Sequence, residues 1–162
     1  MHPIKARRTH YSERGPVPQD VISTVDFELP PLAEGHVRVA VLAAPINPSD
    51  VLTLTGEYGI LPPLPAVGGN EGVGRVIEAA ADVTHLAVGT VVLLPVGCGT
   101  WTTHVDLPAK HLVALPSGVE PVPLSMLTVS PPTGLLMPTE FVDLQPGDWV
   151  IQNAANSAVG GY

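Results

Sequence analysis

The residues of this chain whose types and spacing could do chemistry centre on a tyrosine between glycines. Tyr58 stands in Gly56-Glu57-Tyr58-Gly59, where the glycines let the backbone close on a ligand. Tyrosine side chains are in general protonated at neutral pH by a factor of about a thousand, so such a phenol can donate a proton. Asn47 and Asn70, on either side of it in the sequence, carry amides that can hydrogen-bond a ligand. The alternative for Tyr58 is a side chain that packs its loop.

The chain offers no ligand set for zinc. A catalytic zinc requires three protein ligands from Cys, His and acidic side chains, and a structural zinc commonly requires four cysteines. Cys98 is the single cysteine, which also excludes an internal disulfide and is typical of a reducing compartment. The six histidines show no ligand spacing; they are His2, His10, His36, His85, His104 and His111. We therefore expect chemistry without zinc.

Composition argues against several classes of partner. The formal net charge is −8 and only seven residues are Lys or Arg, which disfavours binding to nucleic acid. No apolar run approaches the roughly 18 residues that a membrane span requires. The N-terminal residues lack the apolar stretch of a secretory signal, and the basic residues from Lys5 to Arg8 are too few for a transit peptide. The expected compartment is the cytoplasm, with the mitochondrial matrix as the alternative.

The apolar pattern predicts a mainly β fold. Strands are expected over residues 4–11, 21–29, 36–44, 72–79, 88–95, 100–107 and 111–115. Strands at spacings near ten residues, separated by turn signals, indicate a compact barrel or sandwich. In the strand over 36–44, Val37 and Val39 face one way and Arg38 the other.

Short helices and turns join these strands. Pro48 is expected to open a short helix, with Asn47 as its cap. The segment 56–70 is rich in glycine and proline and must form a loop. From Val122 the pattern predicts two short helices around a bend at Pro131-Pro132, with a second interruption at Pro138.

The last residues read as the start of a nucleotide-binding unit. Trp149 to Gln152 is expected to form a buried strand. The residues that follow, up to Gly161, are small, polar and glycine-ended, as in a strand-to-helix phosphate loop. A phosphate loop of this kind indicates a dinucleotide ligand.

Taken in order, these motifs resemble the medium-chain dehydrogenase/reductase superfamily, and specifically its zinc-free enoyl thioester reductase branch. The matching segments are Asn47–Asp50, Gly56–Gly59, Pro65–Gly72, Gly99–Trp101, Leu144–Asp148 and Gln152–Gly160. Compared with the zinc-dependent branch, Asn47–Asp50 replaces an early cysteine and Asn70 replaces the histidine of a Gly-His-Glu motif. The resemblance implies a GroES-like β-barrel catalytic domain over 1–125. Residues 126–162 are then interdomain helices with the first strand and glycine turn of a truncated Rossmann domain.

The resemblance also implies an activity. A 2-enoyl thioester reductase of fatty acid metabolism is an NADPH-dependent oxidoreductase that acts on a CH–CH double bond. It adds hydride at the β-carbon and a proton at the α-carbon. The implied substrate is an enoyl-CoA or an enoyl-ACP, and the implied full-length form is a homodimer. Zinc has no part in this chemistry.

Particular residues carry over from the family. Tyr58 matches the proton-donor tyrosine, and Asn47, Asn70 and Trp101 are the implied substrate-binding residues. Asn47 can cap its helix at the same time, and the alternative for Trp101 is packing in the barrel. The implied cofactor-binding residues are Thr133, Asn156, Ser157, Ala158 and Val159.

Two further readings stay open. A quinone reductase of the same superfamily takes small uncharged substrates, which the scarcity of Lys and Arg tolerates more easily than a coenzyme A tail. The second open interpretation is a stand-alone GroES-like interaction module that catalyses no reaction. Because a Rossmann phosphate site needs the helix behind its glycine turn, these 162 residues are expected to bind dinucleotide negligibly and to be inactive alone.

Overall fold

The structure, a computed structural model, describes residues 5–161 and is mainly β. A two-stranded antiparallel sheet pairs β1 (Lys5–His10) with β2 (Ser23–Glu28). A five-stranded sheet has the order β6-β3-β4-β5-β7, and every neighbouring pair in it is antiparallel. Its strands are β3 (His36–Ala43), β4 (Val73–Ala79), β5 (Val91–Leu93), β6 (His104–Pro108) and β7 (Val113–Ala114). The predicted fold class is confirmed.

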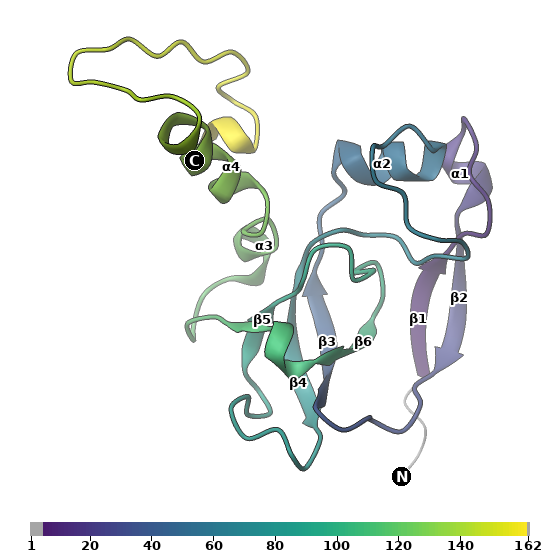
Figure 1. Cartoon of the computed structure of the whole chain (residues 1–162). Coiled ribbons are helices and arrows are strands. Elements are labelled where there is room, and N and C mark those ends of the chain that lie inside the picture. The colour runs from purple at the N-terminus through teal and green to yellow at the C-terminus, as the bar shows by residue number, and fades with distance from the viewer. Residues whose placement is uncertain (1–4, 162) are drawn as a thin grey trace.

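Backbone hydrogen bonds join the two sheets. The N–H of Thr103 donates to the carbonyl of Arg7 at 2.8 Å, and the N–H of Thr9 donates to the carbonyl of Trp101 at 2.9 Å. These contacts connect β1 to the segment that leads into β6, so the sheets approach the closed arrangement of a small barrel. Figure 1 shows the two sheets side by side, with α1 (Pro18–Val21) and α2 (Pro48–Thr55) together at one end.

The core lies on one face of the five-stranded sheet. Val37, Val39 and Val76 are completely buried there, as the alternation in β3 predicts. Arg38 points to the other face but is also buried. Its guanidinium lies 2.8 Å from the carboxylates of both Asp106 and Glu78 on the neighbouring strands, and this pairing compensates the desolvation of its charge.

The predicted strands agree with the structure to within a few residues in the first half of the chain, apart from Ile4, which lies outside the described residues. The expected strand from residue 21 begins two residues later, because Pro18 starts the one-turn helix α1. The later strands are shorter than predicted or displaced, and a 3₁₀ turn, η1 (Ala109–His111), separates β6 from β7.

Two helices are present beyond residue 120, as expected, but the breaks predicted at the prolines are misplaced. α3 (Pro121–Leu124) and α4 (Ser130–Glu140) are separated by turns over 125–129 and not by a bend at Pro131-Pro132. Pro131 lies in the first turn of α4, where its missing N–H costs no hydrogen bond. Pro138, predicted to interrupt the helix, lies inside α4. It is near the C-terminal end, so few helical bonds remain for it to disrupt. Among residues 5–161, no helix combines the length and apolar character needed to cross a bilayer.

The predicted buried strand over Trp149–Gln152 is wrong for this structure. Trp149 is 94% exposed and Ile151 is 95% exposed, and neither belongs to a strand. A strand requires neighbours for its backbone groups, and none of the strands described above pairs with this segment. The chain ends in turns and a short 3₁₀ segment, η2 (Val159–Gly161), at the yellow end of Figure 1. The domain division at residue 125 stays a prediction.

Candidate active site

The start of α2 holds the first group of candidate residues. Asn47 is the N-cap residue with extended backbone, and Pro48 follows at the first helical position, as predicted. The N–H of Asn47 donates to the Asp50 carboxylate at 2.7 Å, which is one contact of a capping box. Asp50 is therefore held against the helix start, and it is only 3% exposed.

Tyr58 lies just beyond the other end of α2. Gly56 ends the helix in the left-handed conformation, with φ of 85°. The N–H groups of Glu57 and Tyr58 then both donate to the carbonyl of Leu52, at 2.9 and 3.2 Å. The Tyr58 side chain is 41% exposed, so its phenol is reachable from solvent instead of packed in the barrel. We call residues 57–65 the Tyr58 loop.

A cavity of about 320 Å³ lies beneath the Tyr58 loop. Ile60 and Pro62 of the loop line it, whereas Tyr58, Asn47 and Trp101 do not. Asn70 is the predicted substrate-binding residue that the cavity includes. The remaining lining residues are Tyr11, Asp50, Thr53, Leu54, Val67, Gly68, Gly69, Val96 and Gly97.

Two buried ionisable side chains, those of Asp50 and Tyr11, line this cavity. The sequence analysis identified neither as a site residue. Burial raises the pKa of Asp50, and the backbone N–H groups of Asn47 and Asn70 oppose that rise. Burial also raises the pKa of Tyr11, which is 2% exposed; Arg14 lowers it and Asp50 raises it further. Both groups are therefore biased toward their protonated forms. No local signal in the sequence marks Tyr11, because only the fold brings it next to α2.

Asn47 and Glu71 form a buried polar contact. The Asn47 side-chain nitrogen donates to Glu71 Oε1 at 2.8 Å, and Glu71 is 1% exposed. The hydroxyl of Thr100 donates to the Glu71 carbonyl at 2.8 Å and holds the segment from the other side. Because Glu71 follows Asn70 directly, this contact brings the two predicted substrate-binding asparagines to the same part of the molecule.

Trp101 packs beneath the cavity floor. Its indole nitrogen donates to the Pro45 carbonyl at 2.9 Å. Its ring contacts Gly68 and Gly69, where an added Cβ would collide with it. The indole therefore supports two glycines that line the cavity and does not itself line it. A direct contact with substrate stays a prediction.

We expect Gly69→Ala to destabilise the fold more than Gly89→Ala. Both glycines have φ of 95°, so the left-handed strain of about 1 to 2 kcal/mol is common to both variants. A Cβ at Gly69 would lie 2.5 Å from Thr100 Oγ1 and 2.6 Å from Trp101 Cδ1, whereas Gly89 has nothing within 4 Å. Overpacking adds about 1 to 3 kcal/mol at Gly69. Urea unfolding of the two variants measures the difference, and equal midpoints would contradict it.

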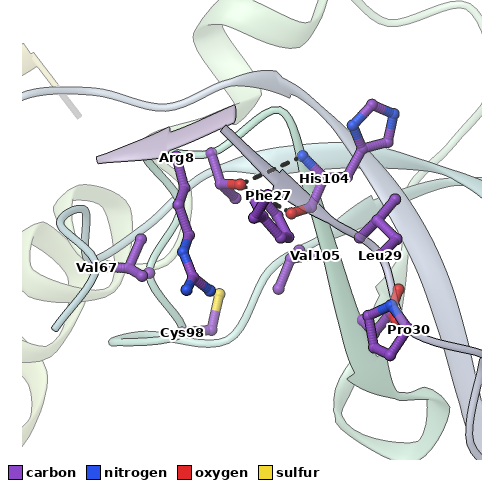
Figure 2. A pocket seen from close by; sticks show the side chains of 11 residues that line it. Arg8, Phe27, Leu29, Pro30, Val67, Cys98, His104 and Val105 are labelled. Carbon is purple, nitrogen blue, oxygen red and sulfur yellow. Dashed lines mark hydrogen bonds between the residues drawn. The ribbon is translucent and has the colours of Figure 1, made fainter. Parts of the chain in front are cut away.

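A second cavity, of about 240 Å³, lies between the two sheets (Figure 2) and contains none of the predicted site residues. Arg8 lies over the Phe27 ring, 4.6 Å from its centroid, and its side chain points toward Cys98. Burial raises the pKa of the Cys98 thiol to about 11, so almost no thiolate exists at neutral pH. Cys98 is therefore not an activated nucleophile in this cavity.

The predicted cofactor residues gather at the C-terminal end. α4, which carries Thr133, packs against η2, and the two elements share a cavity of about 680 Å³. The Thr133 hydroxyl donates to the Val129 carbonyl within the helix, at 2.6 Å. Figure 1 shows this region apart from α2 and the Tyr58 loop. The structure does not bring the predicted cofactor and substrate residues together.

Backbone N–H groups of the turn over 153–161 are hydrogen-bonded within the turn. The N–H of Ser157 donates to Ala154 at 2.9 Å, and the N–H groups of Gly160 and Gly161 donate to the Ser157 hydroxyl and carbonyl, each at 3.1 Å. A pyrophosphate site needs such N–H groups free and a helix N-terminus behind them. The described residues do not fit a complete dinucleotide site.

Among residues 5–161, no group of three or more His, Cys, Asp or Glu side chains is arranged to hold a metal ion. The positions that resemble zinc-ligand positions carry amides, Asn47 and Asn70, which are poor zinc ligands.

The small barrel, the short helix α2, the Tyr58 loop and the half-buried asparagines agree with a GroES-like catalytic domain of the dehydrogenase class. Residues 33–117, more than half of the chain, match the alcohol dehydrogenase GroES-like domain family, and the chain belongs to this family. The resemblance to the medium-chain dehydrogenase/reductase superfamily and its enoyl thioester reductase branch is confirmed.

The chain is similar to curated enoyl-[acyl-carrier-protein] reductases. The chain is 43% identical to the human mitochondrial enoyl-[acyl-carrier-protein] reductase over 159 residues, covering 98% of this chain and 42% of the human protein. It is 39% identical to the Arabidopsis thaliana protein of the same name over 153 residues, covering 93% of this chain and 40% of that protein. The chain thus spans less than half the length of these relatives.

Solved structures of reductases also resemble this chain. The chain superposes on Etr1p in complex with NADP and crotonyl-CoA with a TM-score of 0.89 and 34% identity, over 97% of this chain and 50% of that chain. It also superposes on a putative NADPH:quinone reductase from Bacillus thuringiensis with a TM-score of 0.84 and 33% identity, over 97% of this chain and 47% of that chain.

Proposed function

We propose that the whole protein to which this chain belongs is an NADPH-dependent 2-enoyl thioester reductase, and that Tyr58 is its proton donor. The observation that carries the proposal is the exposed phenol of Tyr58 on the loop whose Ile60 and Pro62 line a cavity with Asn70. The similarity to enoyl thioester reductases supports the reaction class.

The reaction adds two hydrogens across a carbon–carbon double bond conjugated to a thioester. In the whole protein, bound NADPH would supply the hydride for the β-carbon and would be oxidised to NADP⁺. Tyr58 gives its hydroxyl proton to the α-carbon, which forms the new C–H bond and leaves a phenolate. Because Tyr58 is 41% exposed, the phenolate recovers a proton from water without a relay.

The asparagines act on the substrate carbonyl in this proposal. Negative charge grows on the thioester oxygen after the β-carbon gains hydride, and an amide N–H aimed at that oxygen stabilises it. Asn70 lines the cavity and is suited to this role. Asn47, whose amide nitrogen is held by Glu71, orients the site from the helix start, and Trp101 supports its glycine floor.

The cofactor contacts are proposed for the whole protein only. Thr133 and the residues from Asn156 to Val159 are the candidates, by their match to the family's motif. The NADP in the Etr1p complex favours NADPH over NADH. The N–H groups of the turn after Ala154 would have to open from their present bonds before they could hold a phosphate.

Quinone reduction is the second candidate. It is favoured by the similarity to the Bacillus thuringiensis protein and by the scarcity of basic residues for a coenzyme A tail. Among the similar curated proteins, however, the first eight are all named enoyl-[acyl-carrier-protein] reductases. This pattern favours the thioester.

One assay separates the candidates. The whole protein is mixed with NADPH and either crotonyl-CoA or 1,4-benzoquinone, and loss of absorbance of the reduced nicotinamide is followed. We expect kcat/KM for the thioester to exceed that for the quinone by at least about 10-fold, because protonation of the thioester α-carbon gains from a positioned acid such as Tyr58, whereas a quinone oxygen takes its proton readily from water. Faster quinone reduction would overturn the proposal, and inactivity with both substrates would favour the interaction module.

We further propose the mitochondrial matrix as the compartment of the whole protein, in place of the cytoplasm. The human and Arabidopsis thaliana relatives are named as mitochondrial proteins. The homodimer also stays a proposal, with the Etr1p/Etr2p heterodimer from Candida tropicalis as the solved assembly of a similar protein.

A further inference from the structure

The Tyr58 loop depends on one distant side chain for its conformation. Beyond Tyr58, the loop contains glycine, prolines and exposed aliphatic residues and forms no regular structure. Among the described residues, the only hydrogen bond to the stretch 59–65 comes from the guanidinium of Arg14, which donates to the Pro62 carbonyl. A loop held at so few points would otherwise sample many conformations.

Arg14 also contacts the end of α2. A Cβ added at Gly56 would lie 3.3 Å from Cδ and 3.7 Å from Cβ of Arg14, so the arginine stem packs on the helix cap. The next residue, Gly15, donates its N–H to the Leu54 carbonyl at 3.2 Å. The Arg14 side chain therefore contacts Gly56, which precedes Tyr58, and Pro62, which follows it.

The neighbouring backbone fixes the far end of the loop. Tyr11 and Ala66 exchange backbone hydrogen bonds of 3.1 and 2.9 Å, where the loop rejoins the barrel. The segment 11–15 thus contacts the chain just before the Tyr58 loop, at Pro62 within it, and just after it. Of these contacts, the Arg14 side chain makes the one that a substitution can remove without altering the backbone.

We propose that Arg14 is a positioning residue for Tyr58: its guanidinium, bonded to the Pro62 carbonyl, holds the loop so that the phenol stays beside the cavity. The inference rests on the proposed function, because Tyr58 matters only if it donates a proton. Arg14 does not touch the substrate in this proposal. Loss of its contact misplaces the donor, and a displacement of about 1 Å can reduce a rate by about 100-fold.

The test uses the whole protein and the variant Arg14→Met, which keeps most of the stem that packs on Gly56 and removes every donor. We expect kcat for crotonyl-CoA to fall about 10- to 100-fold while KM changes less than about three-fold. Hydrogen exchange at the amides of Glu57 and Tyr58 should accelerate. Guanidinium ion at millimolar concentration should restore part of kcat, a rescue that general destabilisation would not produce.

Two further variants sharpen the result. Arg75→Met is the matched control, because the exposed side chain of Arg75 also donates to a carbonyl, that of Gly89 at 2.9 Å, away from the Tyr58 loop. It should leave exchange at Tyr58 and kcat unchanged. Arg14→Lys keeps a donor near Pro62 and should lose less activity than Arg14→Met; if Arg14→Met does not fold, an intermediate kcat and exchange rate in Arg14→Lys support the proposal.

Several outcomes would overturn the inference. Unchanged exchange at Tyr58 in Arg14→Met shows that Arg14 does not hold the loop, whatever the reaction is. Accelerated exchange with kcat within about two-fold of the wild type shows that loop position does not matter. A wild-type protein that does not reduce crotonyl-CoA refutes the proposed function instead, and the exchange measurement still decides whether Arg14 holds the loop.

Discussion

Replacing Tyr58 by phenylalanine in the whole protein is expected to lower kcat for crotonyl-CoA reduction by about 10²- to 10⁴-fold, the range that general acid catalysis contributes. The substitution removes one oxygen from an exposed side chain, so it should change the stability of the fold by less than about 0.5 kcal/mol. Steady-state kinetics at saturating NADPH measures the loss, and unfolding by urea measures the stability.

Another tyrosine, Tyr11, lines the cavity itself and makes the comparison decisive. Tyr11 lines the cavity together with Ile60 and Pro62, and burial raises its pKa, so its hydroxyl is a candidate proton donor. If Tyr58 is the donor, Tyr58→Phe costs far more in kcat than Tyr11→Phe. The reverse order would assign proton donation to Tyr11 and leave Tyr58 as a side chain that packs its loop.

The 162-residue chain by itself is expected to bind NADPH more weakly than about 1 mM, which corresponds to less than about 4 kcal/mol of binding free energy. The N–H groups of Ser157, Gly160 and Gly161 are already bonded within their turn. The short segment η2 offers no helix N-terminus of useful length, so the positive end that attracts a pyrophosphate is missing. Titration followed by nicotinamide fluorescence gives the dissociation constant.

The control for this titration is the whole protein under the same conditions, which should bind NADPH at least about 100-fold more tightly. A micromolar dissociation constant for the 162-residue chain would refute the expectation. It would require the turn over 153–161 to rearrange and expose its N–H groups to the ligand. Hydrogen exchange in that turn, with and without NADPH, would reveal such a rearrangement.

Local sequence patterns predicted the local structure well. The alternation in β3 gave Val37 and Val39 their buried face, and Asn47-Pro48 specified the start of α2. These features depend on residues a few positions apart, whose backbone preferences are set by sterics and by near-neighbour hydrogen bonds. The motif order identified the family for the same reason, since it is a property of the chain alone.

Patterns that need a distant partner were less reliable. The apolar run Trp149 to Gln152 has the composition of a buried strand, but a strand exists only where another strand pairs with it. Pro138 looked like a helix breaker, yet it lies near the C-terminal end of α4, where few helical hydrogen bonds remain for it to disrupt. The strand failed because it lacks a distant partner, and the proline was tolerated because of its position in the helix.

The amino-acid sequence by itself determined the mainly β class, the glycine-flanked tyrosine and the absence of a cysteine set for zinc, because each depends only on residue types and short spacings. Only the tertiary structure decided that Tyr11 shares a cavity with Asp50, that Glu71 holds the amide of Asn47, and that Arg14 reaches the Tyr58 loop. Such contacts join segments that are far apart along the chain. They form when burial of the β core brings those segments together, and no local pattern encodes them.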